Sequence, residues 1–257
     1  MTASPTSLTE SVPDMTALQQ AWAQAIPALQ SVLPEKANTE ALAASMEALY
    51  AMLWQGNQRM NLTRITDPTG FVWRHGVDSL TLLPFIPADA AVLDVGTGAG
   101  FPLLPLALAR PDCTFVGMDS VGKKCDYVAS AAKKLAISPR VTLLHGRCDE
   151  LAHKPEYRHQ FDVVTARGVA ALNTLLELTL PFLKPGGTLL AMKSTQGAEE
   201  ELKTAKHALR ALHARVVEVE ESTIPELAGF CVVRIQSNAT CSDKYPRPQN
   251  KPRLKPL

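Results

Sequence analysis

Residues 92–102 read Val-Leu-Asp-Val-Gly-Thr-Gly-Ala-Gly-Phe-Pro, and this stretch decides the fold. An apolar run that contains Asp94 predicts a strand, and the glycines after it predict a tight turn before a helix. Glycine lets the backbone turn sharply and approach a ligand with no Cβ in the way. Dinucleotide sites use similar turns, but with the spacing G-x-G-x-x-G rather than the G-x-G-x-G found here. The stretch therefore predicts a cofactor site at the end of a strand.

Apolar strands and helical patterns alternate from this turn onward. Strands are expected at residues 91–95, 113–119, 141–145, 161–166, 188–193, 215–219 and 230–236. Helices are expected at residues 101–110, 120–136, 169–183 and 196–213, the second of them capped by Ser120. The alternation predicts an α/β fold with a Rossmann-like, mostly parallel seven-stranded sheet and helices on both faces. The last two strands have no long helix between them, which predicts an antiparallel edge strand and a domain at 89–237.

Three further segments flank this domain. Residues 1–37 are expected to be a flexible extension, disordered at 2–7, with one docking helix at 18–33 interrupted by Pro27. Residues 38–88 predict a helical cap, with one helix from Asn38 or Thr39 to Gly56 and a second from Asp67-Pro68. Residues 238–257 form a basic tail, whose alternating Pro and Lys or Arg is expected to forbid a helix.

Composition places the chain among ordinary globular proteins. It has 257 residues, 46% hydrophobic and 20% charged, and a net charge of +1 that hides an acidic head and a basic tail. Five cysteines without a C-x-x-C pair fit a reducing cytosol, with no disulfide and no zinc site. We read no signal peptide and no apolar run of about 20 residues, so a cytoplasmic protein without a membrane partner is expected. The tail carries the cations Lys244, Arg247, Lys251, Arg253 and Lys255.

Carboxylates at the strand ends indicate which cofactor fits. S-adenosylmethionine has no pyrophosphate but offers an ammonium group, which Asp94 can attract directly or through water. Asp119 ends the second strand, roughly 20 residues after the glycine turn, where a carboxylate accepts from both ribose hydroxyls. A plain acid at a helix N-terminus is the less favoured alternative for Asp119. Asp149 follows the third strand and either accepts from the adenine amino group or caps the next helix.

Arg167 follows the fourth strand, where this fold places its acceptor chemistry. The sequence there shows neither the Asn/Asp-Pro-Pro-aromatic motif of amino-group methyltransferases nor the nucleophilic cysteine of cytosine-C5 enzymes. The Arg167 guanidinium suits a phosphate, a carboxylate or a guanine edge, or else makes a structural salt bridge. His75 is the residue most tempting as a base, but capping or packing of the N-terminal helices is favoured. No metal site is expected.

Several motifs, in order along the chain, resemble the RsmG (GidB) family of 16S ribosomal RNA guanine-N7 methyltransferases. The resemblance spans residues 49–257 and implies S-adenosylmethionine as cofactor and one guanine of the 16S decoding-region loop as substrate. The motifs are Asn61-Leu62-Thr63, Arg74-His75-Gly76-Val77-Asp78-Ser79-Leu80, Asp94 to Pro102, Asp119-Ser120 with Lys123-Lys124, Phe161-Asp162 to Arg167, Lys193, and Tyr245-Pro246-Arg247 with Lys255-Pro256-Leu257.

The cofactor site is expected from these motifs together with the strand-end carboxylates. The resemblance itself implies Gly96, Phe101, Cys148, Asp149 and Arg167. The chain departs from the family where Cys148-Asp149 replaces Ala-Glu, Gly168 replaces Ala, and Ser194 replaces the Gly after Lys193. The complete expected set is Asp94, Gly96, Gly98, Phe101, Asp119, Ser120, Cys148, Asp149 and Arg167.

Guanine N7 has an exposed lone pair, so its methylation needs no base and depends on positioning. Arg167, Lys193 and His75 are the positioning candidates. Cations hold phosphates and aromatic faces stack bases, although the tail could also be a plain solvated end. The partner is expected to be 16S ribosomal RNA or the small ribosomal subunit, bound by a monomer. The expected RNA-binding residues are Arg59, Asn61, Arg64, Arg74, Lys123, Lys193, Tyr245, Arg247 and Lys255.

Three other functions share part of this pattern. A small-molecule methyltransferase would have the cofactor motifs but would not need a basic tail. An NAD-dependent oxidoreductase would need G-x-G-x-x-G. A non-catalytic module would bind S-adenosylmethionine or RNA without turnover.

Overall fold

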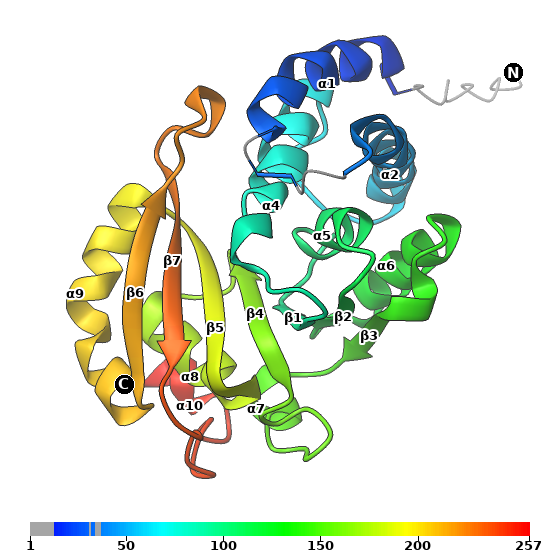
Figure 1. The fold of residues 1–257 in the computed structure, drawn as a ribbon. Helices are drawn as coiled ribbons and strands as arrows, with labels where there is room; N and C mark the ends of the chain where they lie inside the picture. Colours follow the sequence, from blue (N-terminus) through cyan, green and yellow to red (C-terminus); the bar gives the residue numbers. More distant parts are fainter. Residues whose placement is uncertain (1–12, 31, 34–36) are drawn as a thin grey trace, which may run out of the picture.

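The computed structural model describes residues 13–30, 32–33 and 37–257 and has a seven-stranded sheet at its centre (Figure 1). The strand order is β3-β2-β1-β4-β5-β7-β6. Neighbours from β3 to β5 run parallel, whereas β7 is antiparallel to both β5 and β6. The predicted sheet with an antiparallel hairpin at one edge is confirmed. The strands are β1 (Ala91–Val95), β2 (Thr114–Asp119), β3 (Val141–His145), β4 (Phe161–Arg167), β5 (Leu183–Ser194), β6 (Ala214–Glu221) and β7 (Phe230–Ser237).

Helices cover both faces of the sheet, because alternate residues of each strand point to opposite sides. Val92 and Val163 belong to one hydrophobic cluster, and their neighbours Leu93 and Val164 belong to the other. The first cluster includes the cap, α5 (Leu103–Ala109) and α6 (Gly122–Lys134). The second includes α7 (Cys148–Leu151), α8 (Leu172–Thr179), η4 (Leu180–Phe182) and α9 (Thr195–Ala211).

The helical cap forms where its sequence supplies N-terminal caps. Asn38 Oδ1 accepts from Ala41 N at 2.9 Å, and Asp67 Oδ1 accepts from Gly70 N at 2.7 Å, so both predicted caps are present. The second helix contains a π-helical segment, a rare form that recurs at functional sites. The elements are α2 (Thr39–Arg59), α3 (Pro68–Gly70), the π-helix η1 (Phe71–Val77), α4 (Asp78–Leu80) and η2 (Leu83–Phe85).

The predicted docking helix is α1 (Met15–Leu29), and it is part of the cap's core. Leu18, Trp22 and Ala25 are at most 2% exposed, and Pro27 lies inside the helix. Residues 15–29 of the predicted flexible extension are therefore a packed helix. The disorder predicted at residues 2–7 lies outside the described residues.

The expectation that the basic tail contains no helix is wrong. Residues Lys251–Leu254 form α10, with Pro252 in its first turn, where no intrahelical N–H is needed. Pro252 is buried, and α10 packs against α8. The tail therefore belongs to the folded domain.

Two properties of the described residues bear on function. None of their helices combines the length and apolar character needed to cross a membrane. Within the same residues, no three His, Cys, Asp or Glu side chains gather as a metal site would require.

We expect Trp22→Ala to lower the free energy of unfolding by about 3–5 kcal/mol, the usual cost of truncating a buried Trp. The exposed Gln24 on the same helix provides the matched control, and Gln24→Ala should change stability by less than about 0.5 kcal/mol. Chemical denaturation of the three proteins measures both values. Equal stability of the Trp22 variant and the parent protein would mean that α1 is only loosely attached.

Candidate active site

The glycine turn after β1 is tied to the end of β2. Backbone N–H groups of Gly96 and Thr97 donate to the Met118 carbonyl at 2.9 and 3.0 Å. Gly96 has φ +72° and Gly98 has φ +57°, in the left-handed region that favours glycine. A Cβ at Gly96 would lie 2.8 Å from Val169 Cγ2, whereas at Gly98 it would meet nothing nearer than a backbone oxygen at 3.8 Å. The turn is therefore covered at Gly96 and open to a ligand at Gly98.

Asp94 places a buried, half-satisfied carboxylate under this turn. It is 1% exposed; Oδ1 accepts from Thr165 Oγ1 at 2.8 Å, and Oδ2 has no hydrogen-bond partner among the described residues. Burial raises the pKa of Asp94 to about 6, although the bond from Thr165 opposes the shift. A buried carboxylate oxygen without a partner fits the ammonium group of S-adenosylmethionine, either directly or through one water.

Asp119 joins the glycine turn to the start of α6. Its Oδ2 accepts from Gly98 N at 3.0 Å, and its Oδ1 accepts from Val121 N at 2.9 Å. Each carboxylate oxygen retains a lone pair for a ribose hydroxyl, so both sequence-based interpretations of Asp119 fit this position. Ser120 lies next to it but does not cap α6 as predicted, because the N-cap residue is Val121 and no side chain bonds there.

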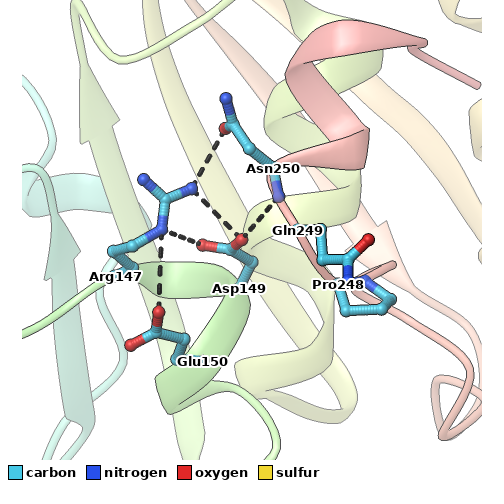
Figure 2. Close-up of a pocket in the computed structure, with 6 residues that line it drawn as sticks. All are labelled: Arg147, Asp149, Glu150, Pro248, Gln249 and Asn250. Carbon is cyan, nitrogen blue, oxygen red and sulfur yellow. Dashed lines mark hydrogen bonds and ion pairs between the residues drawn. The ribbon is translucent and has the colours of Figure 1, made fainter.

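Cys148 and Asp149 follow β3, at the start of the short helix α7. Figure 2 shows that the Asp149 carboxylate faces Arg147 and Asn250. Oδ1 accepts from Arg147 Nε at 3.0 Å, and Oδ2 accepts from Asn250 N at 3.2 Å. Burial alone would raise the pKa of Asp149, but these bonds outweigh it and hold the pKa below its usual range. Burial raises the pKa of the Cys148 thiol to about 12, so it stays protonated.

A cavity of about 270 Å³ lies beside the contact between this loop and the C-terminal segment. Its lining residues come from two parts of the chain that are far apart in sequence but adjacent in Figure 2. They are Arg147, Asp149, Glu150, Pro248, Gln249 and Asn250.

The cap holds the Arg167 guanidinium at the end of β4. Nη1 donates to the Arg74 carbonyl at 2.7 Å and to Asp78 Oδ2 at 3.1 Å, and Nη2 lies 3.0 Å from His75 Nδ1. Nε–H and one Nη2–H have no acceptor among the described residues, so the fork can still donate to a ligand. The predicted structural salt bridge is present, and it leaves part of the guanidinium free.

His75 is a neutral acceptor for Arg167. Arginine can only donate, so His75 Nδ1 must accept, and Nε2–H then donates to Thr63 Oγ1 at 2.9 Å. The ring also stacks on Phe101 with centroids 4.3 Å apart and planes 11° from parallel. Burial, with the nearby charges of Arg167 and Arg74, lowers the pKa of His75 to about 3. These contacts fit the favoured packing role and oppose a role as base.

Lys193 holds the loop that follows β4. Its Nζ donates to the Ala170 carbonyl at 2.6 Å and pairs with Glu201 Oε2 at 2.7 Å. The same Glu201 oxygen accepts from Leu172 N at 2.6 Å. The Lys193 ammonium therefore supports the protein's own loop, beside the site.

The residues expected to bind RNA fall into two groups. Five are exposed on the cap and α6: Arg59, Asn61, Arg64, Arg74 and Lys123. In the tail, Lys255 is exposed but Tyr245 is only 6% exposed. Arg247 makes a two-pronged ion pair, at 2.7–2.8 Å, with Glu177, a carboxylate with no exposed surface. Tyr245 is thus buried, and the partly exposed Arg247 guanidinium is bound to the protein's own carboxylate.

Sequence reasoning missed several residues that shape the site. Asn57 organises the exposed loop 61–64, because its Oδ1 accepts from Leu62 N and Thr63 N. Thr165 bonds to Asp94 and Val169 packs on Gly96, and nothing in their own sequence marks them. Glu177 did carry a signal: it is an acid on the buried face of an otherwise apolar helix and must have a partner.

The sheet order, the glycine turn and the strand-end carboxylates together define a class I, Rossmann-like methyltransferase. The crystal structure of an O-methyltransferase from Bacillus cereus in complex with S-adenosylhomocysteine has the same fold, with a TM-score of 0.55 at 15% identity. The similarity covers 85% of this chain and 99% of that one.

The chain belongs to the family described as GidB, rRNA small subunit methyltransferase G, which matches residues 42–227. The ribosomal RNA small subunit methyltransferase G of Deinococcus deserti is 41% identical over 213 residues, which are 82% of this chain and 86% of that protein. Its counterpart in Lactobacillus delbrueckii subsp. bulgaricus is 42% identical over 206 residues, 78% of this chain and 85% of the relative. The family predicted from the sequence is confirmed.

The buried carboxyl of Asp94 should make cofactor binding depend on pH. Its pKa of about 6 means that the free protein holds a proton there below pH 6, whereas a bound ammonium group favours the carboxylate. Binding must then release that proton, so the Kd for S-adenosylhomocysteine should rise by up to about tenfold per pH unit below 6 and be flat above about 7. Calorimetry from pH 5 to 8 measures this. Asp94→Asn should bind weakly at every pH, and a flat profile for the parent protein would contradict the assignment.

Proposed function

We propose that the protein transfers the methyl group of S-adenosylmethionine to N7 of one guanine in the decoding-region loop of 16S ribosomal RNA. Family membership supports a small-subunit RNA substrate. The observation that favours a guanine is the Arg167 fork, which is held at the end of β4 with two N–H groups free. A guanidinium can donate to guanine O6 while N7 faces the methyl group.

The donor side of the proposed site is built by three carboxylates and the glycine turn. Asp94 Oδ2 would hold the ammonium group, Asp119 the ribose hydroxyls, and the loop Cys148–Asp149 the adenine edge. When bound, the cofactor supplies an electrophilic methyl group on a sulfonium centre. Gly98 leaves the space through which the backbone can approach it.

On the acceptor side, residues position the base and do not move a proton. N7 attacks with its own lone pair, so no residue has to deprotonate it, and the protein's work is to align nucleophile and methyl group. Asp78 offsets the charge of Arg167, at 3.1 Å, which limits repulsion of the sulfonium and of the positive charge that forms on the purine. His75 and Phe101, stacked on one another, support the guanidinium from the cap side.

RNA would reach this site over the cap. Arg59, Arg64 and Arg74 are exposed there, and Lys123 is exposed on α6. The Arg74 guanidinium lies 4.5 Å from the centroid of the Phe230 ring, which places a cation and an aromatic ring together near the hairpin β6–β7. Cations of this kind hold phosphates, and binding that depends on them weakens with salt.

The methylated atom can be identified chemically. N7 methylation leaves a fixed positive charge on the imidazole ring and makes the glycosidic bond labile. We expect labelled methyl groups in undermethylated 16S RNA at one site, which reduction followed by aniline then cleaves. Labelled RNA that resists cleavage and yields N2-methylguanosine on digestion would refute the acceptor atom and leave the methyltransferase assignment intact.

Two alternative functions give different outcomes in the same assay. A small-molecule methyltransferase would leave RNA unlabelled while turning over a low-molecular-weight acceptor. A non-catalytic module would bind S-adenosylhomocysteine and RNA without transferring any label.

His75 provides a second test, because a positioning residue and a base respond differently. His75→Asn keeps an acceptor for Arg167, whereas His75→Ala removes it. We expect kcat to fall by about 100-fold in the Ala variant, as for a displaced reactant, and by less than about tenfold in the Asn variant. At saturating cofactor, where the Asp94 titration no longer limits binding, the pH profile of kcat for the parent protein should show no inflection near pH 6.5. Equal loss in both variants, together with such an inflection, would indicate a general base.

A further inference from the structure

The C-terminal segment is anchored to the domain by two arginines. Arg158 Nη1 donates to the Tyr245 carbonyl, and its Nη2 donates to the carbonyls of Cys241 and Ser242, all at 2.9 Å. Arg247 pairs with the fully buried Glu177. The carbonyl of Pro246 also lies 2.8 Å from His153 Nε2. These contacts hold residues 248–254 at the edge of the candidate cofactor site.

The first contact of this segment is with the adenine side of the site. Asn250 N donates to Asp149 Oδ2 at 3.2 Å, and Asn250 Oδ1 accepts from Arg147 Nη2 at 3.0 Å (Figure 2). Gln249 and Asn250 have φ values of +60° and +58°, a pair of left-handed residues that persists only where the surroundings hold it. Asn250 therefore connects the two residues that shape the loop after β3.

The second contact is with the loop after β4. Arg253 Nη1 donates to the Val169 carbonyl at 3.2 Å, and Thr174 Oγ1 donates to the Pro252 carbonyl at 3.1 Å. Val169 in turn packs on Gly96, where a Cβ would lie 2.8 Å from Val169 Cγ2. One turn of chain, residues 250–253, thus bridges the two loops that flank the expected adenosine position.

We propose that Asn250 and Arg253 are positioning residues of the cofactor site, which hold Asp149 and Val169 in place and so set the affinity for the adenosyl group. This inference rests on the proposed use of S-adenosylmethionine. It gives the basic tail a role that its charge did not predict, because its arginines bond within the protein. Lys251 and Lys255 are exposed, and no hydrogen bond or ion pair holds either side chain within the described residues.

The test compares two substitutions on the same helix that each remove one positive charge. Arg253→Met removes the bond to Val169, and Lys251→Met removes an exposed cation. Asn250→Gly permits the left-handed backbone while removing the acceptor for Arg147. We expect the Kd for S-adenosylhomocysteine to rise by about threefold or more in each of the Asn250 and Arg253 variants and by about tenfold or more in the double variant. It should stay within about twofold in Lys251→Met.

Three further measurements separate positioning from general stability. The melting temperature without ligand should match the parent protein. KM for S-adenosylmethionine should rise in the double variant while kcat is kept. Amide hydrogen exchange should accelerate around Asp149 and Val169 in the double variant and stay unchanged in Lys251→Met. Arg253→Lys, which keeps a donor, should bind the ligand more tightly than Arg253→Met.

Unchanged cofactor binding in the double variant would overturn the inference. So would equal losses of RNA affinity in the Arg253 and Lys251 variants with cofactor binding intact, which would make the tail a nucleic-acid surface. A parent protein that binds S-adenosylhomocysteine but methylates another atom would refute the proposed acceptor alone. One that does not bind it at all would refute both proposals.

Discussion

The ends of β1 and β2 are held together by backbone hydrogen bonds, and the geometry of the site depends on them. Gly96 and Thr97 donate to the Met118 carbonyl, and Gly98 donates to Asp119. The turn is thereby fixed by the neighbouring strand. The carboxylates of Asp94 and Asp119 then occupy defined positions below and beside it. The same turn supports Val169 and, through it, the loop after β4.

The charged groups on the two sides of this turn, Asp94 and Arg167, have different surroundings. On the donor side, one Asp94 oxygen is buried and has no partner in the described residues, which costs free energy until a cation arrives. On the acceptor side, Arg167 pairs with Asp78 and donates to the neutral His75 and to a carbonyl group. Under the proposed function, the donor side would attract a cation. The acceptor side would recognise its ligand through the direction of two N–H groups.

The succession of strands and helices along the chain, the glycine turn and the strand-end carboxylates could be predicted because they depend on local sequence. Short apolar runs bounded by turn residues predicted β1 and β3 with their observed bounds. An N-cap residue followed by proline predicted the helix that begins after Asp67. Contacts between distant segments could not be predicted in this way. Arg247 looked like a cation for RNA because Glu177, 70 residues away, gave no local sign of pairing with it. His75 could be weighed as a base against the favoured packing role, but its burial and its bond with Arg167, which keep it neutral, arise only in the fold.

Under the proposed function, the burial of Asp94 would also make the two halves of the site respond differently to ionic strength. Mobile ions screen charges that are exposed to water, but they do not penetrate to a carboxylate with 1% of its surface exposed. Arg59 and Arg64 on the cap are exposed and lie within reach of those ions. Salt would then weaken the hold on a polyanion and leave the donor pocket nearly unaffected. A rise in salt would release the polyanion first, while the small ligand remained bound.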